Sequence, residues 1–323
     1  MNTERTASYL FGIDGGGTRS RIGICDGKGK FLARLEGYST NIYSVTEEEA
    51  FGNLKSLISE ALQQAGLTKE DITSGCLGSA GLGRTREQEL FKRWFEIILP
   101  KVPVKLCTDG EILLCGGLQR LEGFCLITGT GSIALGRRKD CSLVRAGGLG
   151  YLLGDEGAAA WIGRCATARS LRSLEGRDHL TTMLPVILRK VCLKEPQDLV
   201  WWIHHDADKS KVAALAPIVT EAARQGDELA LDILQTGAAE LALLVKSVVE
   251  RTPDISNKEL VLAGGVIEHD EILSGSLKEI LARDFPDIAV LDPRGSALDG
   301  ALLLANETNS FVGESCTSRK TII

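Results

Sequence analysis

The most informative stretch of the chain reads Leu10-Phe11-Gly12-Ile13-Asp14-Gly15-Gly16-Gly17-Thr18-Arg19-Ser20. An apolar run ends in a carboxylate, three glycines and a hydroxyl follow, and a second β-rich run, 21–25, comes directly after. This pattern predicts a β-hairpin with a tip of almost bare backbone, because glycine tolerates positive φ and adds no side chain. Successive free amides form a concavity that binds anions. We therefore expect the turn to bind phosphate, with Asp14 placed for a metal ion and Thr18 for a phosphate oxygen. The alternative is an ordinary glycine-rich turn.

A similar element recurs downstream. An apolar strand, 124–128, runs into Gly129-Thr130-Gly131-Ser132, and a second apolar strand extends to 136. A third strand, 142–146, precedes a further glycine-rich stretch at 147–150. Two such elements, one opening each half, indicate duplicated nucleotide-binding halves that face each other across a cleft.

The remaining pattern alternates strands and helices, which predicts mixed sheets covered by helices on both faces. In the first half we expect strands at 8–14, 20–26, 30–36, 74–80 and 102–108, and helices at 46–66, 84–99 and 111–118. In the second half we expect helices at 155–175, 179–193, 197–205, 209–225 and 227–251, a strand at 261–266, a helix to about 283, a strand at 288–291 and a helix at 296–305. The polar tail from Asn306 is expected to be loose.

Composition narrows the class of protein. With 323 residues, of which 44% are hydrophobic and 25% charged, the chain can form two globular domains. A net charge of −6 without a basic stretch argues against a nucleic-acid partner. No apolar run approaches the ~20 residues that span a bilayer, and the first residues lack a signal-peptide pattern, so we expect a cytoplasmic protein with no membrane partner. Nine cysteines without a C-x-x-C pair are expected to be reduced thiols rather than ligands of a zinc or iron–sulfur site.

Six short motifs occur in an order that resembles the N-acetylglucosamine kinases of the BadF/BadG-type ATPase family, within the sugar kinase/hsp70/actin superfold. They are Asp14-Gly-Gly-Gly-Thr18, Ser39-Thr-Asn41, Thr108-Asp109, Gly129-Thr-Gly-Ser132, Gly154-Asp-Glu-Gly157 and Ala263-Gly-Gly265. The resemblance spans roughly residues 8–305. It implies an α/β fold of two RNase H-like (actin-like ATPase) domains facing a cleft, with the second domain enlarged by helices. We place the domains at 1–117 plus 296–323 and at 118–295.

The resemblance also implies the site residues. The ATP-binding positions would be Gly15, Gly16, Gly17, Thr18, Thr130, Ala213 and Gly265, and Asp14 would act through Mg²⁺. The sugar-binding positions would be Asn41, Asp109, Ser132, Gly148, Leu149, Gly150 and Asp155. The implied reaction is ATP-dependent phosphorylation of N-acetylglucosamine or N-acetylmuramic acid at the 6-hydroxyl, in amino-sugar or cell-wall sugar salvage, by a homodimer.

Three polar residues carry both a functional and a structural interpretation. Asp109 follows a strand and precedes a helix, where a carboxylate could accept the sugar hydroxyl proton as a general base, but it could also cap that helix. Asp155 could grip sugar hydroxyls or cap the helix that follows it. Asn41 suits an N-acetyl or hydroxyl group, or an Asx turn.

One departure from the family pattern concerns the sugar. The family often has Trp where this chain has Leu149, so an aromatic wall beside the sugar is lost, and the smaller side chain could leave room for a lactyl ether. A glucosamine or glucose kinase of the same fold is therefore an alternative. From other classes, the alternatives are an activator-type ATPase that bridges an iron–sulfur cluster and a catalytically silent sugar sensor.

Overall fold

The computed structural model describes residues 8–310 of the chain. These residues form two compact units. Unit 1 contains 8–123, 139–142 and 293–310, and unit 2 contains 124–138 and 143–292. Each unit has its own sheet, and each of the two hydrophobic core clusters falls within one unit.

The sheet of unit 1 has five strands in the order β3-β2-β1-β4-β5. Its strands are β1 (Tyr9–Gly15), β2 (Arg19–Asp26), β3 (Phe31–Tyr38), β4 (Ile72–Ser79) and β5 (Val104–Cys107). The first three strands are antiparallel neighbours, and β4 and β5 run parallel to β1. The β1–β2 register pairs Gly15 with Ser20, so the first glycine turn closes this hairpin as predicted.

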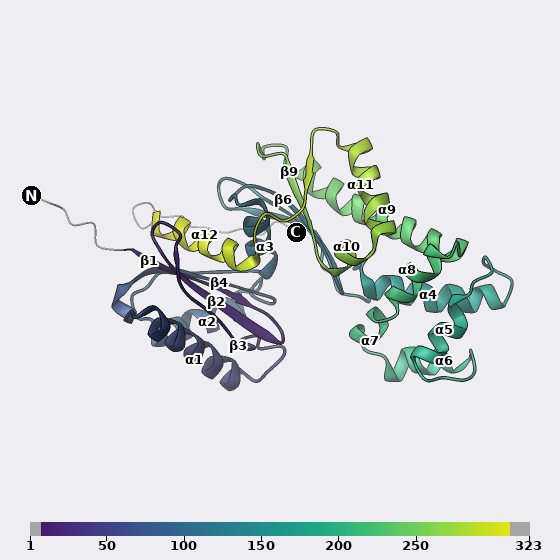
Figure 1. Cartoon of the computed structure of the whole chain (residues 1–323), viewed down its shortest axis with the longest axis horizontal. Helices are drawn as coiled ribbons and strands as arrows, with labels where there is room; N and C mark the ends of the chain where they lie inside the picture. Colours follow the sequence, from purple (N-terminus) through teal and green to yellow (C-terminus); the bar gives the residue numbers. More distant parts are fainter. Residues whose placement is uncertain (1–7, 311–323) are drawn as a thin grey trace, which may run out of the picture. The chain divides into compact units, whose positions relative to one another are not determined.

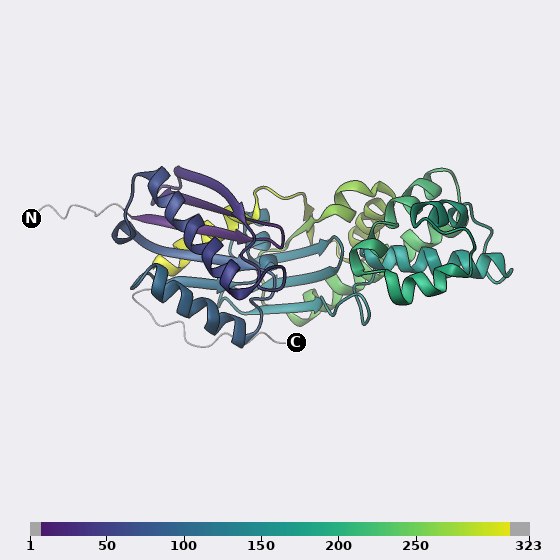
Figure 2. The ribbon, with the colours of Figure 1, turned by 90° about the horizontal axis from the view of Figure 1, so that it is seen from below.

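Four helices cover this sheet, two on each face. Helices α1 (Glu47–Ala65) and α2 (Thr85–Ile98) pack on one face, and α3 (Asp109–Leu118) and α12 (Ala297–Ser310) on the other (Figure 1). Figure 2 shows α1, in dark blue, lying across the purple strands at the start of the chain. The predicted capping signal of α1 is confirmed, because Thr46 and Glu49 form a capping box.

The sheet of unit 2 also has five strands, in the order β10-β9-β6-β7-β8. They are β6 (Gly123–Thr128), β7 (Ser132–Arg137), β8 (Leu143–Gly147), β9 (Glu259–Ala263) and β10 (Ala289–Leu291). β9 runs parallel to β6 and β10, whereas β7 and β8 are antiparallel. The second glycine turn joins β6 to β7, as predicted.

Unit 2 carries eight of the described α-helices, which confirms that it is the unit enlarged by helices. They are α4 (Ala159–Leu174), α5 (Met183–Lys190), α6 (Asp198–Trp201), α7 (Lys209–Ala213), α8 (Ala216–Arg224), α9 (Glu228–Arg251), α10 (Gly265–His269) and α11 (Glu271–Asp284) (Figure 1). Helices α4, α8, α9 and α11 supply much of its core, in which Leu234 and Leu241 are fully buried.

The predicted α/β class is confirmed, but several predicted helices are divided. The helix predicted at 209–225 is two helices, because Pro217 stands in the first turn of α8 and cannot donate a backbone hydrogen bond to a preceding turn. The helix predicted after 266 is broken at Asp270, whose side chain caps α11. At the C-terminal end α12 continues to Ser310, so the tail is helical beyond Asn306, and the rest of the tail lies outside the described residues.

Candidate functional site

The glycine turn of unit 1 presents free backbone donors. The Gly16 amide donates to the Arg19 carbonyl at 3.1 Å, and the Ser39 hydroxyl donates to the Gly16 carbonyl at 3.0 Å. Within residues 8–310 the amides of Gly17 and Thr18 have no hydrogen-bond acceptor, and both residues are exposed. Free amides of this kind are what an anion-binding concavity requires, so the turn stays a candidate for the phosphate site that the sequence predicts.

Two carboxylates lie near this turn within unit 1. Asp14 is in β1, just before the glycines, and Asp109 is the first residue of α3. Burial raises the pKa of Asp14; the positive charge of Arg21 lowers it, and the negative charge of Asp109 raises it. The two carboxylates are thus close enough to repel each other. Paired carboxylate oxygens suit a hard divalent cation such as Mg²⁺, so the donor set fits the predicted metal.

Asp109 is not the cap of α3, contrary to the structural alternative. Thr108 takes that role, since its side chain accepts from the Glu111 amide at 3.2 Å. The Asp109 carboxylate instead accepts from the Gly110 amide at 3.0 Å. Solvent reaches this side chain, yet the protein atoms around it desolvate it partly and raise its pKa above the ordinary value. A carboxylate with a raised pKa and no capping duty is suited to accept a proton.

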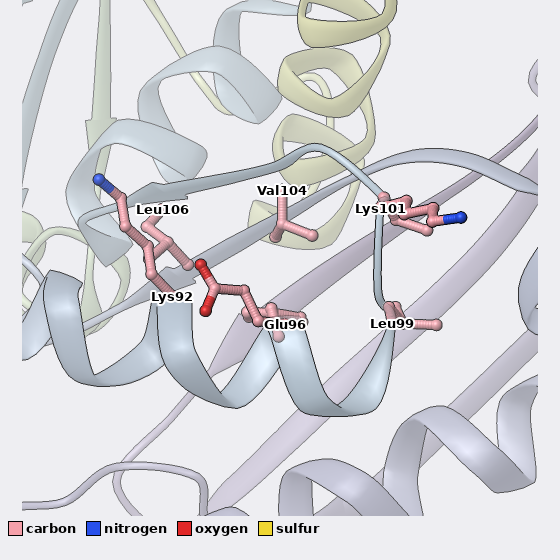
Figure 3. A pocket seen from close by; sticks show the side chains of 8 residues that line it. Lys92, Glu96, Leu99, Lys101, Val104 and Leu106 are labelled. Carbon is pink, nitrogen blue, oxygen red and sulfur yellow. The ribbon is translucent and has the colours of Figure 1, made fainter.

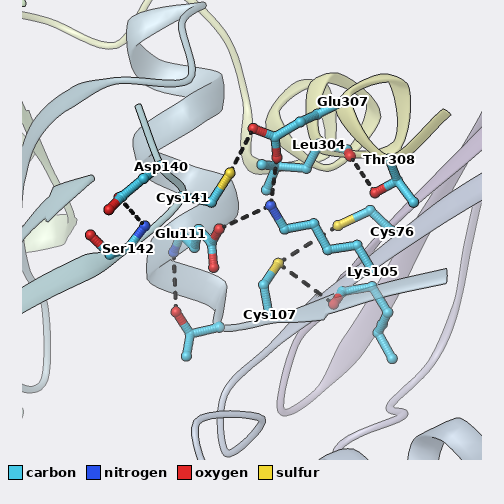
Figure 4. Close-up of polar contacts among 12 residues, drawn as sticks. Cys76, Lys105, Cys107, Glu111, Asp140, Cys141, Ser142, Leu304, Glu307 and Thr308 are labelled. Atoms are coloured by element: carbon cyan, nitrogen blue, oxygen red, sulfur yellow. Dashed lines mark hydrogen bonds and ion pairs between the residues drawn. The ribbon is translucent and has the colours of Figure 1, made fainter. Parts of the chain in front are cut away.

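Figure 4 shows a buried ion cluster of Lys105, Glu111 and Glu307, the first two of which flank Asp109 in the sequence. The Lys105 ammonium lies 3.3 Å from a carboxylate oxygen of Glu111 and 2.7 Å from one of Glu307. The three side chains are between 3% and 8% exposed, so both acidic groups are paired inside the protein. This cluster ties β5 and α3 to α12 and thereby holds the β5–α3 connection, which carries Asp109, in one place.

Asn41 lies in the loop after β3 of unit 1 and is buried. Its side-chain oxygen accepts from the Tyr43 amide at 2.9 Å, so the Asx turn of the structural alternative is present. A carboxamide has two donors and further acceptor capacity, which this single bond leaves available. The Asx turn therefore orients Asn41 without excluding a ligand contact.

The glycine turn of unit 2 is built on the same plan. The Gly129 amide donates to the Gly131 carbonyl at 2.9 Å. The carbonyls of Gly129 and Thr130 accept from the first amides of α4, those of Ala159 and Ala160, at 2.9 and 3.4 Å. In the part of the chain that the structure describes, the amides of Thr130 and Gly131 have no acceptor. The turn is thus fixed by α4 and still offers donors to an anion.

A cavity of about 500 Å³ opens beside this turn, entirely within unit 2. Three predicted nucleotide-binding positions, Thr130, Ala213 and Gly265, line it together. The remaining lining residues are Gly129, Ala159, Ile162, Ala216, Pro217, Thr220, Arg224, Val266, His269 and Asp270. Small and apolar side chains form most of the wall, and polar groups gather where α8 and α10 contribute. Volume and lining both match a small-molecule pocket.

Most of these lining residues were missed from the sequence, although a signal exists. Ala216, Pro217, Thr220 and Arg224 follow one another at spacings that place them on one face of α8. That face reads as an ordinary core face of an amphipathic helix, and the sequence alone gives no sign that it borders a cavity.

Asp155 is buried and does not cap a helix, so the structural alternative is wrong here too. Helix α4 begins at Ala159 with Ala158 in the cap position. Asp155 has a φ of 59°, in the left-handed region, and its carboxylate accepts from the Ser132 amide at 3.4 Å. Its other oxygen accepts from the Lys209 ammonium at 2.9 Å. Lys209 was not among the predicted site residues.

The remaining sugar-binding positions predicted for unit 2 lie beside Asp155. The Gly148 amide donates to the Ser132 carbonyl at 2.8 Å, which joins the loop at 148–150 to the end of the glycine turn. Leu149 is 57% exposed, so its side chain is free to contact a ligand. Unit 2 therefore collects Ser132, Gly148 and Asp155 in one place, whereas Asn41 and Asp109 belong to unit 1.

A second hollow, of about 150 Å³, lies in unit 1 between α2 and β5 (Figure 3). Lys92, Glu96 and Lys101 line it together with apolar residues, and none of the predicted site residues does. It plays no part in the site.

The chain is similar over most of its length to proteins of known name. An N-acetylmuramic acid/N-acetylglucosamine kinase of Clostridium acetobutylicum is 34% identical, covering 92% of this chain and 98% of the relative. An N-acetyl-D-glucosamine kinase of Dictyostelium discoideum is 32% identical, covering 92% and 97%. A solved structure from Chromobacterium violaceum, provisionally named an N-acetylglucosamine kinase, is 29% identical with a TM-score of 0.70, covering 92% of this chain and 98% of the other.

Across the described residues, no helix combines the length and apolar character needed to cross a bilayer.

Residues 11–305 match the model of the BadF/BadG/BcrA/BcrD ATPase family, which is nearly the whole described chain. With two glycine turns, each at the end of a strand in its own mixed sheet, and relatives above 30% identity over nine-tenths of its length, the chain belongs to the BadF/BadG/BcrA/BcrD ATPase family.

Proposed function

We propose that this ATP-dependent sugar kinase phosphorylates an amino sugar, N-acetylglucosamine or N-acetylmuramic acid, at its 6-hydroxyl. A role in amino-sugar or cell-wall sugar salvage, a cytoplasmic location and a homodimeric state belong to the same proposal. The observation that carries it is the cavity of unit 2, where Thr130, Ala213 and Gly265 meet beside a turn with free amides.

The cavity suits a nucleoside. Ile162, Pro217 and Val266 offer an apolar surface for a flat base, and His269 and Arg224 add polar groups at the wall. The Thr220 hydroxyl donates to the Asp270 carboxylate at 2.6 Å, which keeps that buried acid paired. A nucleoside held here would place its phosphates toward Thr130 and the free amides of the turn.

Unit 1 supplies the chemistry for the acceptor. Phosphoryl transfer needs a group that takes the proton of the attacking hydroxyl and groups that offset the phosphate charge. Asp109 suits the first role, because its pKa is raised and the Gly110 amide donates to one of its two carboxylate oxygens. Asp14 would offer an oxygen donor for Mg²⁺, which when bound neutralises phosphate charge. The amides of Gly17 and Thr18 add neutral donors for the same purpose.

Each unit carries a polar side chain suited to a sugar. Asn41 offers a carboxamide and Asp155 a carboxylate, which suit an N-acetyl group and paired hydroxyls. Leu149, exposed in the loop at 148–150, takes the place where the family often carries Trp. We infer that this smaller side chain admits the lactyl ether of N-acetylmuramic acid.

A coupled ADP-release assay with Mg-ATP tests the proposal against N-acetylglucosamine, N-acetylmuramic acid, glucosamine, N-acetylmannosamine and glucose. We expect turnover on one or both of the first two sugars, and their ratio reports whether Leu149 leaves room for the lactyl group. A 6-deoxy analogue of the better substrate should bind without turnover. Silence on every sugar with slow sugar-independent ATP hydrolysis would contradict the proposal and favour an activator-type ATPase.

A further inference from the structure

Lys209 places a positive charge directly against the glycine turn of unit 2. It is the first residue of α7, and its ammonium lies 2.9 Å from the Asp155 carboxylate. A Cβ atom added at Gly131 would lie 3.0 Å from this ammonium and 2.6 Å from the carboxylate. The charge pair therefore packs on the bare backbone of the turn itself, a contact that only glycine at this position permits.

The same short helix reaches the cavity with its other end. Ala213 is four residues after Lys209, so the two lie on one face of α7, a single turn apart. Ala213 lines the cavity together with Gly129 and Thr130 of the turn. A ligand that fills the cavity and continues along the turn would therefore pass the Lys209 ammonium.

The Lys209 ammonium is the member of the ion pair that such a ligand could contact. The Asp155 side chain is 3% exposed, whereas that of Lys209 is 37% exposed. An ammonium has three donors, and among the described residues Asp155 is the acceptor of one of them, with no acceptor present for the others. Lysine binds phosphate as a point charge, typically beside a glycine-rich turn whose amides contact the same group.

We propose that Lys209 binds the polyphosphate chain of the nucleotide while it keeps its ion pair with Asp155. It would be a further nucleotide-binding residue, and it would link the phosphates to the carboxylate that we assign to the sugar. This inference rests on the proposed function, because it takes the cavity as the nucleoside site.

Calorimetric titration with adenosine, ADP and ATP, in the absence of sugar, tests the inference. Lys209→Met should weaken ADP and ATP binding by about tenfold to a hundredfold, since it removes a charged partner, and should leave adenosine binding unchanged. Lys211→Met is the matched control. Lys211 is two residues further along α7, exposed, with its ammonium on the Asp206 carbonyl at 2.7 Å, and its loss should change none of the three affinities.

A double variant separates direct binding from an effect through Asp155. In Lys209→Met the buried Asp155 carboxylate loses its partner and could itself repel phosphate, or destabilise the fold. Asp155→Asn combined with Lys209→Met removes both charges and this repulsion. If Lys209 contacts phosphate, the double variant stays weak for ADP.

Two results would overturn the inference. One is wild-type ADP affinity in the double variant, because Lys209 would then only neutralise Asp155. The other is unchanged ADP affinity in Lys209→Met itself. Failure of the proposed function looks different, because the wild-type protein would then turn over none of the sugars in the ADP-release assay, whatever its affinity for ADP. If the cavity were not the nucleoside site, the wild-type protein would not bind adenosine.

Discussion

The two glycine turns share a backbone plan and differ in what surrounds them. In each, one glycine amide closes the turn and the next two amides have no acceptor in the described residues. Beside the first turn lie Asp14 and Asp109; burial and the negative charge of Asp109 raise the pKa of Asp14, and Arg21 lowers it. Beside the second, Lys209 pairs with Asp155, and a cavity of about 500 Å³ opens.

Under the proposed function, this difference suits the two units to different tasks. An excess of negative charge attracts a divalent cation and can take up a proton, so unit 1 is suited to the metal and the base. A near-neutral turn beside an apolar cavity can hold a nucleoside and its phosphates, so unit 2 is suited to the nucleotide. The likeness of the backbones would not reveal this division, which comes from the side chains and the space around them.

The largest effect is expected from a change at Asp109, the proposed general base in unit 1. Asp109→Asn should lower kcat by ~10²–10⁴, the usual contribution of general-base catalysis, because the amide cannot accept the hydroxyl proton. Affinity for ADP should stay unchanged, since Asp109 is not among the residues that line the cavity. In the wild-type enzyme kcat/KM should rise with pH through a pKa above the ordinary Asp value of 3.8, because only the ionised carboxylate acts as a base.

Steady-state kinetics and ADP titration of the same preparation check this prediction. Glu60→Gln, which neutralises an exposed carboxylate on α1 of the same unit, is the control and should behave as wild type. Normal turnover in Asp109→Asn would show that Asp109 is not the general base, and it would contradict the assignment of the base to unit 1. A parallel loss of ADP affinity would show that the division is less sharp than we infer.

A second test compares glycines of the two turns. A Cβ at Gly129 would meet no atom within 4 Å, whereas one at Gly16 would lie 2.5 Å from the Arg19 carbonyl oxygen. Gly129→Ala should therefore fold normally, with Tm unchanged or slightly higher, and raise the KM for ATP by about tenfold as the methyl group enters the ligand's space. Gly16→Ala should instead lower stability by about 1–3 kcal/mol, because it forces a backbone shift.

Thermal unfolding and ATP kinetics of the two variants separate a turn that needs glycine for its own geometry from one that needs it for a ligand. If Gly129→Ala had a wild-type KM, the nucleotide would not approach this turn. If Gly16→Ala were as stable as wild type, the crowding at the first turn would be relieved by a small local adjustment.

Patterns local in sequence predicted most of the fold. The strand–glycine–strand signal located both turns, and the Thr46 capping box located the start of α1, because each depends on residues only a few positions apart. The break between α7 and α8 was missed although Pro217 marks it, since the apolar spacing continues across the break. At Asp109 and Asp155 the sequence left helix capping open as an alternative, and the structure removes it, because Thr108 caps α3 and α4 begins only at Ala159.

Individual site residues were predicted only where they belong to a recognisable sequence motif. Lys209 and Asp155 are 54 positions apart, and no local pattern joins them, so their ion pair follows from the folded chain alone. The cavity as a whole could not be predicted, because the turn after β6 meets parts of α4, α7, α8 and α10 there, and sequence periodicity assigns these helix faces to the core. Tertiary contacts of this kind are what the structure adds.

The smallest effect is expected from removing the charge of Asp14 in unit 1. Burial raises the pKa of Asp14, so at neutral pH the folded protein carries an ionised carboxylate that folding disfavours. Asp14→Asn should therefore give a slightly higher Tm than wild type at neutral pH. As the pH falls through the raised pKa, the wild-type carboxylate binds a proton in the folded state, and the difference should shrink and vanish below the ordinary value of 3.8.

Asp26 provides a control of opposite sign in the same sheet. Backbone amides of Lys30 and Lys28 donate to its carboxylate and lower its pKa, so Asp26→Asn should reduce Tm at neutral pH and lose that effect in acid. Scanning fluorimetry across this pH range, with and without Mg²⁺, measures the Tm of both variants. Mg²⁺ should raise the Tm of wild type and of Asp26→Asn, but not that of Asp14→Asn, because the carboxylate that folding disfavours is the one assigned to the metal. A lower Tm for Asp14→Asn at neutral pH without Mg²⁺ would mean that Arg21 outweighs burial, and that the negative charge of unit 1 is already compensated within the protein.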